Sequence, residues 1–557
     1  METSQRPRRH ISKACEGCRQ QKTKCNGESP CKRCSRLSLT CVVRDVTRQR
    51  QQRLQIRRTL ARFGDDASST IMQSALRPVR IRNEITGSGV PRTAVYGPTS
   101  TVAILHLIFS RKSGHAASTG TTNVTNSNLS LETFNYHHFT MGSSLPLDPA
   151  ILAPPLCLTV IPKQLLECFL NRYIETAWGT VPIQSPAQLT SLLQASCSAF
   201  SQNALPPTIY PILLYQLALG SLLTLHGELS QMLVKESSLF DSTAGGCGYG
   251  GLAEEMRLQL VVLMISLHEV GNFDKAYEIL GHAQGIIWTA GYHLDPQAQT
   301  PGVKRLLRTL LSVDIYVCIA VGRPSLLSSA ICLSSNDADI DSPVPKFVFG
   351  LFKIINNTLQ AQQHPDMNFD KLWESAWTTH NKLVSFWAEN QPALQFAHAD
   401  PGAPAGVTGK MGLHVVLHQY AVLTNFRPFL LYLGYRSITG GDKEDNNTGA
   451  TPMSQKSNYS KETETRLSAI SEYIYTSAST IISTLQELPM NSYFLETACM
   501  SLICQGLWHG TQYAVQIWDA LDKGLQCMEA LQHQRVASMR LAAVRSAIKQ
   551  SGLQRPS

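Results

Sequence analysis

The sequence predicts a mainly α-helical protein in which a small cysteine-rich N-terminal module is joined by a flexible linker to a large, all-α body. Three observations predict this arrangement. The chain has 557 residues, several times the roughly 100–200 residues of one domain, so at least two units are expected. Six of its 15 cysteines lie within residues 15–41. From about residue 156 onward, apolar residues recur with the spacing of amphipathic helices.

The composition excludes several classes of protein. Hydrophobic residues make up 43% of the chain and charged residues 16%, which is too apolar for a wholly disordered protein. No apolar run approaches the roughly 18–20 residues of a transmembrane helix. Residues 1–18 lack the apolar stretch of a secretory signal peptide. We therefore expect an intracellular protein without a membrane-spanning segment, whose cysteines do not form a disulfide framework.

The positive charge of the chain is concentrated at its N-terminus. Residues 1–62 contain 17 Lys or Arg and only 4 Asp or Glu, whereas the whole chain has a net charge of +9. Residues 1–14 form a basic tail within this segment. A basic arm on a nearly neutral body is typical of a nucleic-acid-binding module. An import signal or a solvated linker would give the same charge.

The cysteine block contains the same spacing twice. Two copies of C-x2-C-x6-C follow each other, formed by Cys15, Cys18, Cys25 and by Cys31, Cys34, Cys41. Zinc in structural sites prefers four thiolates, so two zinc ions need eight bonds. Six cysteines supply eight bonds only if two sulfurs bridge both metals. Because the block has almost no large apolar residues, metal binding must supply its folding energy. The spacing therefore predicts a binuclear cluster that holds two Zn2+ per chain.

Two other interpretations of this block remain open. The cysteines could cluster by chance, without a metal. Alternatively, Cys15, Cys18, Cys31 and Cys34 could form a single four-cysteine zinc site, which would leave the third cysteine of each copy unused.

The segment ACEGCRQQKTKCNGESPCKRCSRLSLTC resembles the fungal Zn2Cys6 binuclear zinc cluster DNA-binding domain, which would occupy residues 15–44. The resemblance implies that Cys15 and Cys31 bridge the two zinc ions. It also implies which cysteines complete the two sites, with Cys18 and Cys25 on one zinc ion and Cys34 and Cys41 on the other.

The same resemblance places DNA contacts on a short helix that starts near Cys18. The family typically has two adjacent basic residues in this loop, which read a CGG triplet, whereas this chain has Gln21 followed by Lys22. We expect Lys22 to read base edges, because a Lys ammonium can donate to guanine O6 and N7, with Gln21 as the next candidate. Five further basic residues are expected to contact phosphates: Arg19, Lys24, Lys32, Arg33 and Arg36.

Two linking segments follow the cysteine block. Residues 45–63 are strongly basic, and apolar residues with two polar members fit a heptad there, so a basic linker or a short coiled coil is expected. Residues 64–155 are rich in Ser, Thr, Gly and Asn, which predicts a largely disordered linker.

The body is expected to span residues 156–550. Amphipathic periodicity predicts helices at 164–178, 208–236, 253–269, 273–290, 302–320, 368–388, 409–426, 464–487 and most of 491–549. Residues 438–463 are rich in Gly, Asn, Asp and Ser and are expected to form a disordered insertion. Helix stops are expected at Gly291 and at Gly322, before Pro324.

Residues of about 160–435 resemble the fungal-specific transcription factor regulatory domain, also called the middle homology region. The resemblance is carried by KAYEILGHAQGIIWTAGYHLDP, RLLRTLLSVDIYVCIAVGRP, DADIDSPVP and LHQYAVLTNFRPFL. It implies that the body couples DNA binding to metabolic or partner signals.

Signals for an enzyme are weak. The glycines of GGCGYGG, at 245–251, satisfy G-x-G-x-x-G, but no buried strand precedes them. His414 and His418 lie one helical turn apart, but Val415 stands where a zinc protease needs its glutamate. No catalytic residue is predicted.

Together these features predict a zinc-dependent, sequence-specific transcription factor that regulates RNA polymerase II transcription in the nucleus. We expect it to read CGG-like triplets in double-stranded DNA, as a homodimer with transcriptional coregulators. The resemblance suggests a pathway in secondary metabolism or nutrient utilisation. An enzyme that works from residues 160–557 alone, and a nonspecific nucleic-acid-binding or RNA-binding module, are the alternatives.

Overall fold

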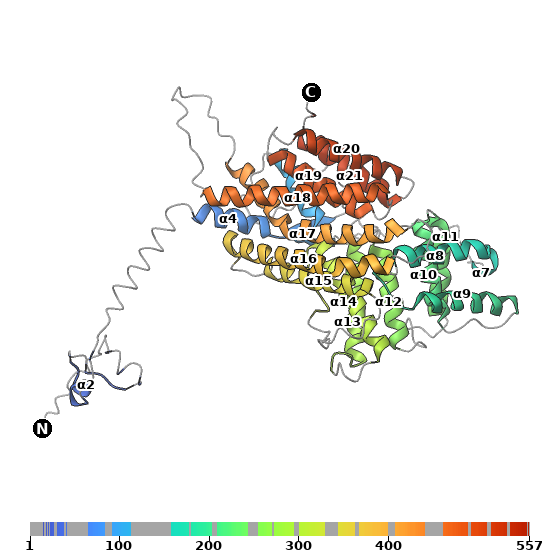
Figure 1. The fold of residues 1–557 in the computed structure, drawn as a ribbon, viewed down its shortest axis with the longest axis horizontal. Coiled ribbons are helices and arrows are strands. Elements are labelled where there is room, and N and C mark those ends of the chain that lie inside the picture. Colours follow the sequence, from blue (N-terminus) through green and yellow to red (C-terminus); the bar gives the residue numbers. More distant parts are fainter. Residues whose placement is uncertain are drawn as a thin grey trace. The chain divides into compact units, whose positions relative to one another are not determined.

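The computed structural model divides the chain into two compact units, Met1–Ser69 and Thr70–Ser557 (Figure 1). In the first unit it describes residues 15, 18, 21, 23–26, 30–37, 41 and 65–69. In the second it describes 70–83, 92–112, 157–177, 180–202, 209–224, 226–242, 254–269, 272–294, 300–328, 343–362, 367–398, 407–440, 461–487, 492–508, 514–531, 535–553 and 555. The basic tail and the heptad of residues 45–63 lie outside the described residues.

The cysteine module contains the short helix α2 (Lys32–Arg36), which begins directly after Cys31. Among its described residues the five buried apolar side chains are all cysteines, with Cys41 packed against them. The module therefore has no hydrocarbon core among its described residues.

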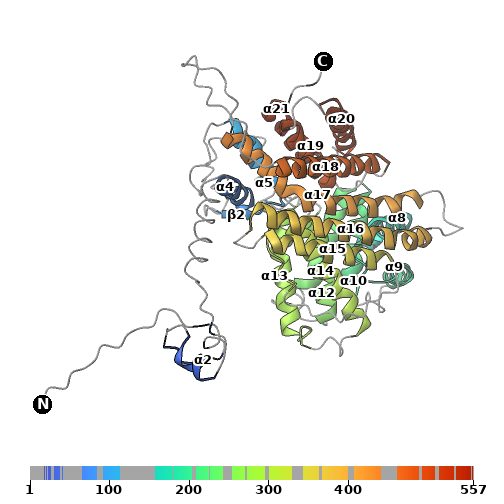
Figure 2. The ribbon, with the colours of Figure 1, turned by 60° about the vertical axis from the view of Figure 1, so that its left-hand side comes forward.

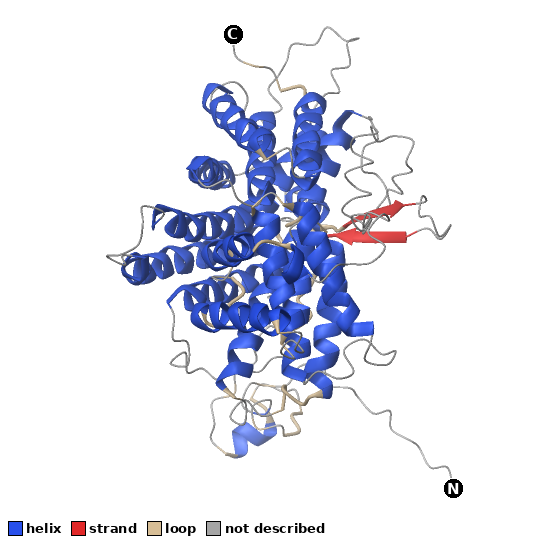
Figure 3. Cartoon of the chain, turned by 90° about the vertical axis from the view of Figure 1, so that its right-hand side faces the viewer, coloured by secondary structure: helices blue, strands red, loops and turns tan. Residues whose placement is uncertain are grey.

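The second unit is almost entirely helical in its described part, as the sequence predicts (Figure 3). Its first helix, α4 (Asp65–Leu76), starts just before the boundary and is followed by an antiparallel hairpin of β1 (Val79–Asn83) and β2 (Arg92–Tyr96), in which Val79 pairs with Tyr96. The remaining helices are α5 (Thr101–Lys112), α7 (Cys157–Val160), α8 (Lys163–Thr176), α9 (Pro186–Ser201), α10 (Tyr210–Leu223), α11 (Gly227–Ser242), α12 (Glu254–Glu269), α13 (Phe273–Thr289), α14 (Pro301–Val321), α15 (Pro343–Gln362), α16 (Phe369–His398), α17 (Val407–Gly440), α18 (Lys461–Glu487), α19 (Ser492–Trp508), α20 (Ala514–Ala530) and α21 (Arg535–Ser551). None of the described helices is both long and apolar enough to cross a membrane.

The described residues of this helical body form two hydrophobic cores that share one helix. Helices α7 to α13 form one core, and α4, α5 and α15 to α21 form the other. Helix α14 contributes to both, because Leu310 and Val317 lie in the first core while Tyr316 and Ile319 lie in the second. Apolar residues on opposite faces of one helix therefore join the two cores into a single unit.

The two predicted helix stops have the expected glycine geometry. Gly291 and Gly322 both have positive φ, 72° and 68°, which a residue with a side chain adopts at a cost. At Gly322 the chain also crosses Gly97, whose N–H donates to the carbonyl of Val321 at 3.0 Å. A Cβ on Gly322 would lie 2.4 Å from the Gly97 Cα, so this crossing requires glycine at both positions.

The segment expected to be a linker differs from that expectation in its described residues. Within 64–155, α4, the hairpin and α5 lie against the helices of the body (Figure 2) and pack into the core of α15 to α21. The side chains of Met72, Ile104 and Leu105 are at most 1% exposed. The physical reason is the apolar run TVAILHLIF at the start of α5, which buries enough surface to offset the surrounding Ser, Thr and Gly. Residues 113–156 lie outside the described part.

Several helix boundaries also differ from those that the apolar periodicity predicts. The predicted helix at 208–236 is broken into α10 and α11 near Thr224, and α15 was not predicted. Helices α16 and α17 continue beyond their predicted ends, through Pro392 and Pro428, where the sequence signal favours a stop. The expected insertion at 438–463 overlaps the ends of α17 and α18, and its residues 441–460 lie outside the described chain.

A polar clamp fixes the hairpin segment to the body. Tyr96 and Arg323 both hydrogen-bond to the carboxylate of Asp274, and the Arg323 Nε–H donates to the carbonyl of Val95 at 2.8 Å. Asp274 and Tyr96 are buried, so this charge is paired where water is excluded.

Candidate metal centre and DNA interface

The six cysteines of the N-terminal block come together in two overlapping groups. One group contains Cys15, Cys18, Cys25 and Cys31, and the other contains Cys15, Cys31, Cys34 and Cys41. Within each group the sulfur atoms lie within 4.8 Å of one another. Cys15 and Cys31 belong to both groups, which is the arrangement that two bridging thiolates require.

The sulfur separations fit a zinc–thiolate cluster. The Sγ atoms of Cys15 and Cys31 lie 3.7 Å apart, as do those of Cys15 and Cys34 and those of Cys18 and Cys31. Tetrahedral zinc with Zn–S bonds of about 2.3 Å places neighbouring sulfurs about 3.8 Å apart. None of the six cysteines forms a disulfide. The donor set therefore fits two tetrahedral zinc ions that share two sulfurs.

Backbone N–H groups around Cys31 favour its thiolate. Cys31 is the N-cap of α2, and its Sγ accepts a hydrogen bond from the Cys34 N–H at 3.4 Å. This bond is the main cause that lowers the pKa of Cys31 to about 6. The pKa of Cys34 is raised instead, first because its thiol donates to the Cys31 sulfur and then because it is desolvated. A thiolate at the shared position is the form that a bridging metal ligand needs.

Two residues other than cysteine hold the backbone of the module in place: Asn26 connects its two halves, and Thr23 closes a turn within the first half. The Asn26 side-chain oxygen accepts from the Lys32 N–H at 3.1 Å, at the first residue of α2. The Thr23 hydroxyl and N–H both donate to the carbonyl of Cys18. Neither residue was predicted from the sequence, although Asn and Thr often satisfy free backbone groups at helix ends and turns.

The described polar residues of the predicted DNA interface lie at the surface, with one exception. Gln21, Lys24, Lys32 and Arg36 are exposed. Arg33 is half-buried, and its Nη2 donates to the Gln21 side-chain oxygen at 2.5 Å. This contact was not expected, and it joins the predicted second base reader to a predicted phosphate contact. Arg19 and Lys22 lie outside the described residues, so their predicted roles stay predictions.

The histidine pair that raised an enzyme hypothesis lies in the core of the body. His414 and His418 are 2% and 6% exposed, and the only potential metal-binding groups found among the described residues are the two cysteine groups. A His418 ring nitrogen lies 3.2 Å from the carbonyl of Leu383, and burial lowers the pKa of His418 to about 4. The glycine-rich loop at 245–251 lies outside the described chain.

Comparison with known families agrees with this geometry. Residues 13–51 match the model of the fungal Zn(2)-Cys(6) binuclear cluster domain, which includes all six cysteines. No curated protein and no solved structure matches the chain significantly. The N-terminal module is thus a Zn(2)-Cys(6) cluster domain that binds two zinc ions, and its presence supports a zinc-dependent, DNA-binding transcription factor.

Proposed function

We propose that this protein is a sequence-specific regulator of RNA polymerase II transcription that acts in the nucleus. The observation that carries the proposal is the pair of cysteine groups that share Cys15 and Cys31, because a metal-built module of this size has its exposed side chains free to bind DNA. In this proposal Cys15 and Cys31 bridge the zinc ions. Cys18 and Cys25 complete one site, and Cys34 and Cys41 the other.

The proposed division of DNA contacts follows from charge and exposure. Lys22 would read guanine edges of a CGG-like triplet, since an ammonium donates to both major-groove acceptors of guanine. Lys24, Lys32 and Arg36 are exposed and can reach phosphates. The phosphate role of Arg33 requires that it release Gln21, or that the pair bind together. Arg19 is proposed as a further phosphate contact.

The proposed partners are a second copy of the chain and transcriptional coregulators. A single module covers too few base pairs for useful genomic selectivity, so two half-sites read by a homodimer are expected. The regulatory role, in secondary metabolism or nutrient utilisation, rests on the sequence resemblance of residues 160–435 to the middle homology region, which stays a prediction. The two cores of the helical body share α14, so the body is a single folded unit to which coregulators could bind.

A competition experiment tests this function. Zinc-loaded, full-length protein is titrated with a duplex containing two CGG triplets and with a scrambled duplex, at one stated salt concentration. We expect the CGG duplex to bind at least roughly 10³-fold more tightly. Equal affinity for the two duplexes would overturn sequence-specific reading and leave a nonspecific nucleic-acid-binding module. Sedimentation of the complex distinguishes a homodimer on two triplets from a monomer on one.

A further inference from the structure

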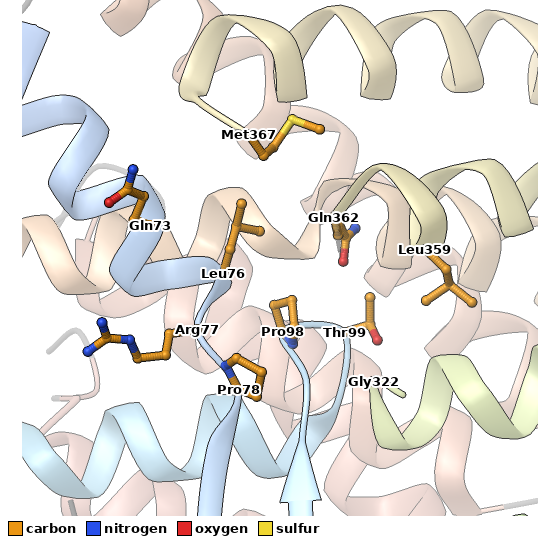
Figure 4. A pocket seen from close by; sticks show the side chains of 10 residues that line it. All are labelled: Gln73, Leu76, Arg77, Pro78, Pro98, Thr99, Gly322, Leu359, Gln362 and Met367. Carbon is orange, nitrogen blue, oxygen red and sulfur yellow. The ribbon is translucent and has the colours of Figure 1, made fainter. Parts of the chain in front are cut away.

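A pocket of about 360 Å3 opens in the second core of the body (Figure 4). One wall comes from residues of the segment that the sequence predicts as linker: Gln73, Leu76, Arg77, Pro78, Pro98 and Thr99. The opposite wall comes from Gly322, the end of α15 and Met367. Volumes of this size are at the lower end of the range for small-molecule sites, roughly 300–1,000 Å3.

The pocket contains a buried hydrogen-bond donor without an acceptor. Gln362 lines the pocket at the last residue of α15 and is only 7% exposed. Its Nε2 has no hydrogen-bond partner among the described residues. Figure 4 shows this amide between Leu359 and Met367, on the side that faces Thr99. A buried amide N–H without an acceptor is costly, so an oxygen atom of a bound molecule would relieve that cost.

The surroundings of the pocket favour a negative charge. No acidic residue lines it, and Arg77, which is exposed at its edge, forms no ion pair within the described part of the chain. Directly behind the wall, the fully buried Arg427 donates from Nη1 to the carbonyl of Thr99. Its Nε and Nη2 have no partner among the described residues. Neither guanidinium group forms an ion pair among the described residues, so both make the local potential more positive.

We propose that this pocket binds a small organic acid with an apolar part. A carboxylate oxygen accepts from the Gln362 amide, and Arg77 balances the charge at the mouth. The apolar part packs against Leu76, Leu359 and Met367. This site goes beyond the proposed DNA-binding function, because it gives the body a ligand of its own.

Binding there would hold together two stretches that are distant in sequence. The first stretch, which includes α4 and the residues after β2, lines one side of the site, and the end of α15 lines the other. A bound ligand would therefore stabilise the packing of the first stretch against α15. A ligand that binds only the docked form shifts the local opening equilibrium towards it. We therefore expect ligand binding to slow amide hydrogen exchange in residues 71–79 and 96–100.

The test uses zinc-loaded, full-length protein and 4-phenylbutyrate as the probe, with neutral 4-phenylbutyramide as its matched control. Saturable binding of the acid at about millimolar concentration is expected by calorimetry, with slower exchange in the two segments. Gln362→Leu and Arg77→Gln should each lower the affinity for the acid by roughly tenfold, which is the usual result of losing one charge-assisted hydrogen bond. Arg545→Gln, at an exposed ion pair on α21, should leave binding unchanged.

Three results would overturn the proposal. They are no saturable binding of the acid to wild-type protein, equal binding of acid and amide, or unchanged binding in both pocket variants. Because Arg77 is exposed, Arg77→Gln keeps the fold, and its melting curve verifies this. A folded Arg77→Gln variant that binds the acid as wild type does would therefore remove the charge argument even if Gln362→Leu unfolds.

Discussion

The two units of this chain differ in what fills their interiors. The buried centre of the cysteine module consists of cysteines, whereas the body has two cores of Leu, Ile, Val and aromatic side chains joined across α14. Apolar burial stabilises a fold in proportion to area, so the body can fold without metal and the module cannot. One polypeptide thus combines a unit that depends on zinc with one that depends on hydrophobic burial, and each can be perturbed separately.

Removal of a shared cysteine should give the largest effect. Cys31→Ala removes a ligand from both proposed zinc sites, so zinc content and DNA binding should be lost while the melting of the body is unchanged. Structural zinc contributes roughly 10–16 kcal/mol of apparent binding free energy, which the module cannot replace. Native mass spectrometry counts the zinc ions, and calorimetry follows the body.

Two variants provide the controls for that experiment. Cys41→Ala should remove a ligand from one proposed site only, and Cys168→Ala, an exposed cysteine of the body, should retain both zinc ions. A single zinc ion at saturation in the wild-type module would contradict the binuclear cluster.

A cavity in the body should give the opposite pattern. Leu310 lies on α14 and is fully buried, so Leu310→Ala should lower the free energy of unfolding of the body by about 2–5 kcal/mol. Zinc content should stay at two. Leu294→Ala, at a leucine that is 74% exposed, is the matched control and should have little effect. Loss of zinc in Leu310→Ala would show that the module depends on the body.

Acid should lower the free energy of unfolding of the body, because the body buries neutral histidines. Burial lowers the pKa of His418 to about 4, below its value of about 6.5 in an unfolded chain. Between these pH values the unfolded state binds a proton that the folded state does not, so the free energy of unfolding falls as pH drops, by about 3 kcal/mol for this group. Fluorescence of Trp387, whose ring is 4.9 Å from His418, follows the unfolding. His418→Gln should show a shallower pH dependence, and an equal slope would exclude His418 as a source.

Lys22→Ala should separate base reading from metal binding. If Lys22 donates to guanine, its loss should cost about 1–3 kcal/mol on the CGG duplex and much less on scrambled DNA, with two zinc ions retained. Titrations of both duplexes measure this difference. Equal weakening on the two duplexes would make Lys22 a phosphate contact and Gln21 the next candidate reader.

Arg36→Ala should give the smallest effect. Arg36 is exposed in the last turn of α2, so we expect it to contact a phosphate. Its loss should lower the affinity for both duplexes alike. The slope of log affinity against log salt should also fall by about one unit, because one fewer counterion is released. An unchanged slope would mean that Arg36 does not contact DNA.

The sequence predicted the features that rest on strong local rules. The repeated cysteine spacing predicted a binuclear cluster, and Gly322 after a long apolar stripe predicted the end of α14. The packing of residues 65–83 and 92–112 could not be predicted, because composition describes the average of a segment while burial depends on distant partners. The contact of Arg33 with Gln21 and the pocket beside Gln362 also need tertiary structure, since neither has a sequence pattern.

Helix α5 makes the body a fold of long-range contacts. It packs against α19 and α21, so residues 101–112 meet residues 535–551, near the other end of the chain. During synthesis, α5 would emerge from the ribosome hundreds of residues before the helix that covers it. Such high contact order slows folding and leaves the apolar run at 101–109 without its native cover in the nascent chain. A fragment that begins at residue 160 would lack α5 altogether and would expose the surfaces of α19 and α21 that α5 covers. The body therefore has to be expressed from residue 65 onward, which keeps both α4 and α5 in that core.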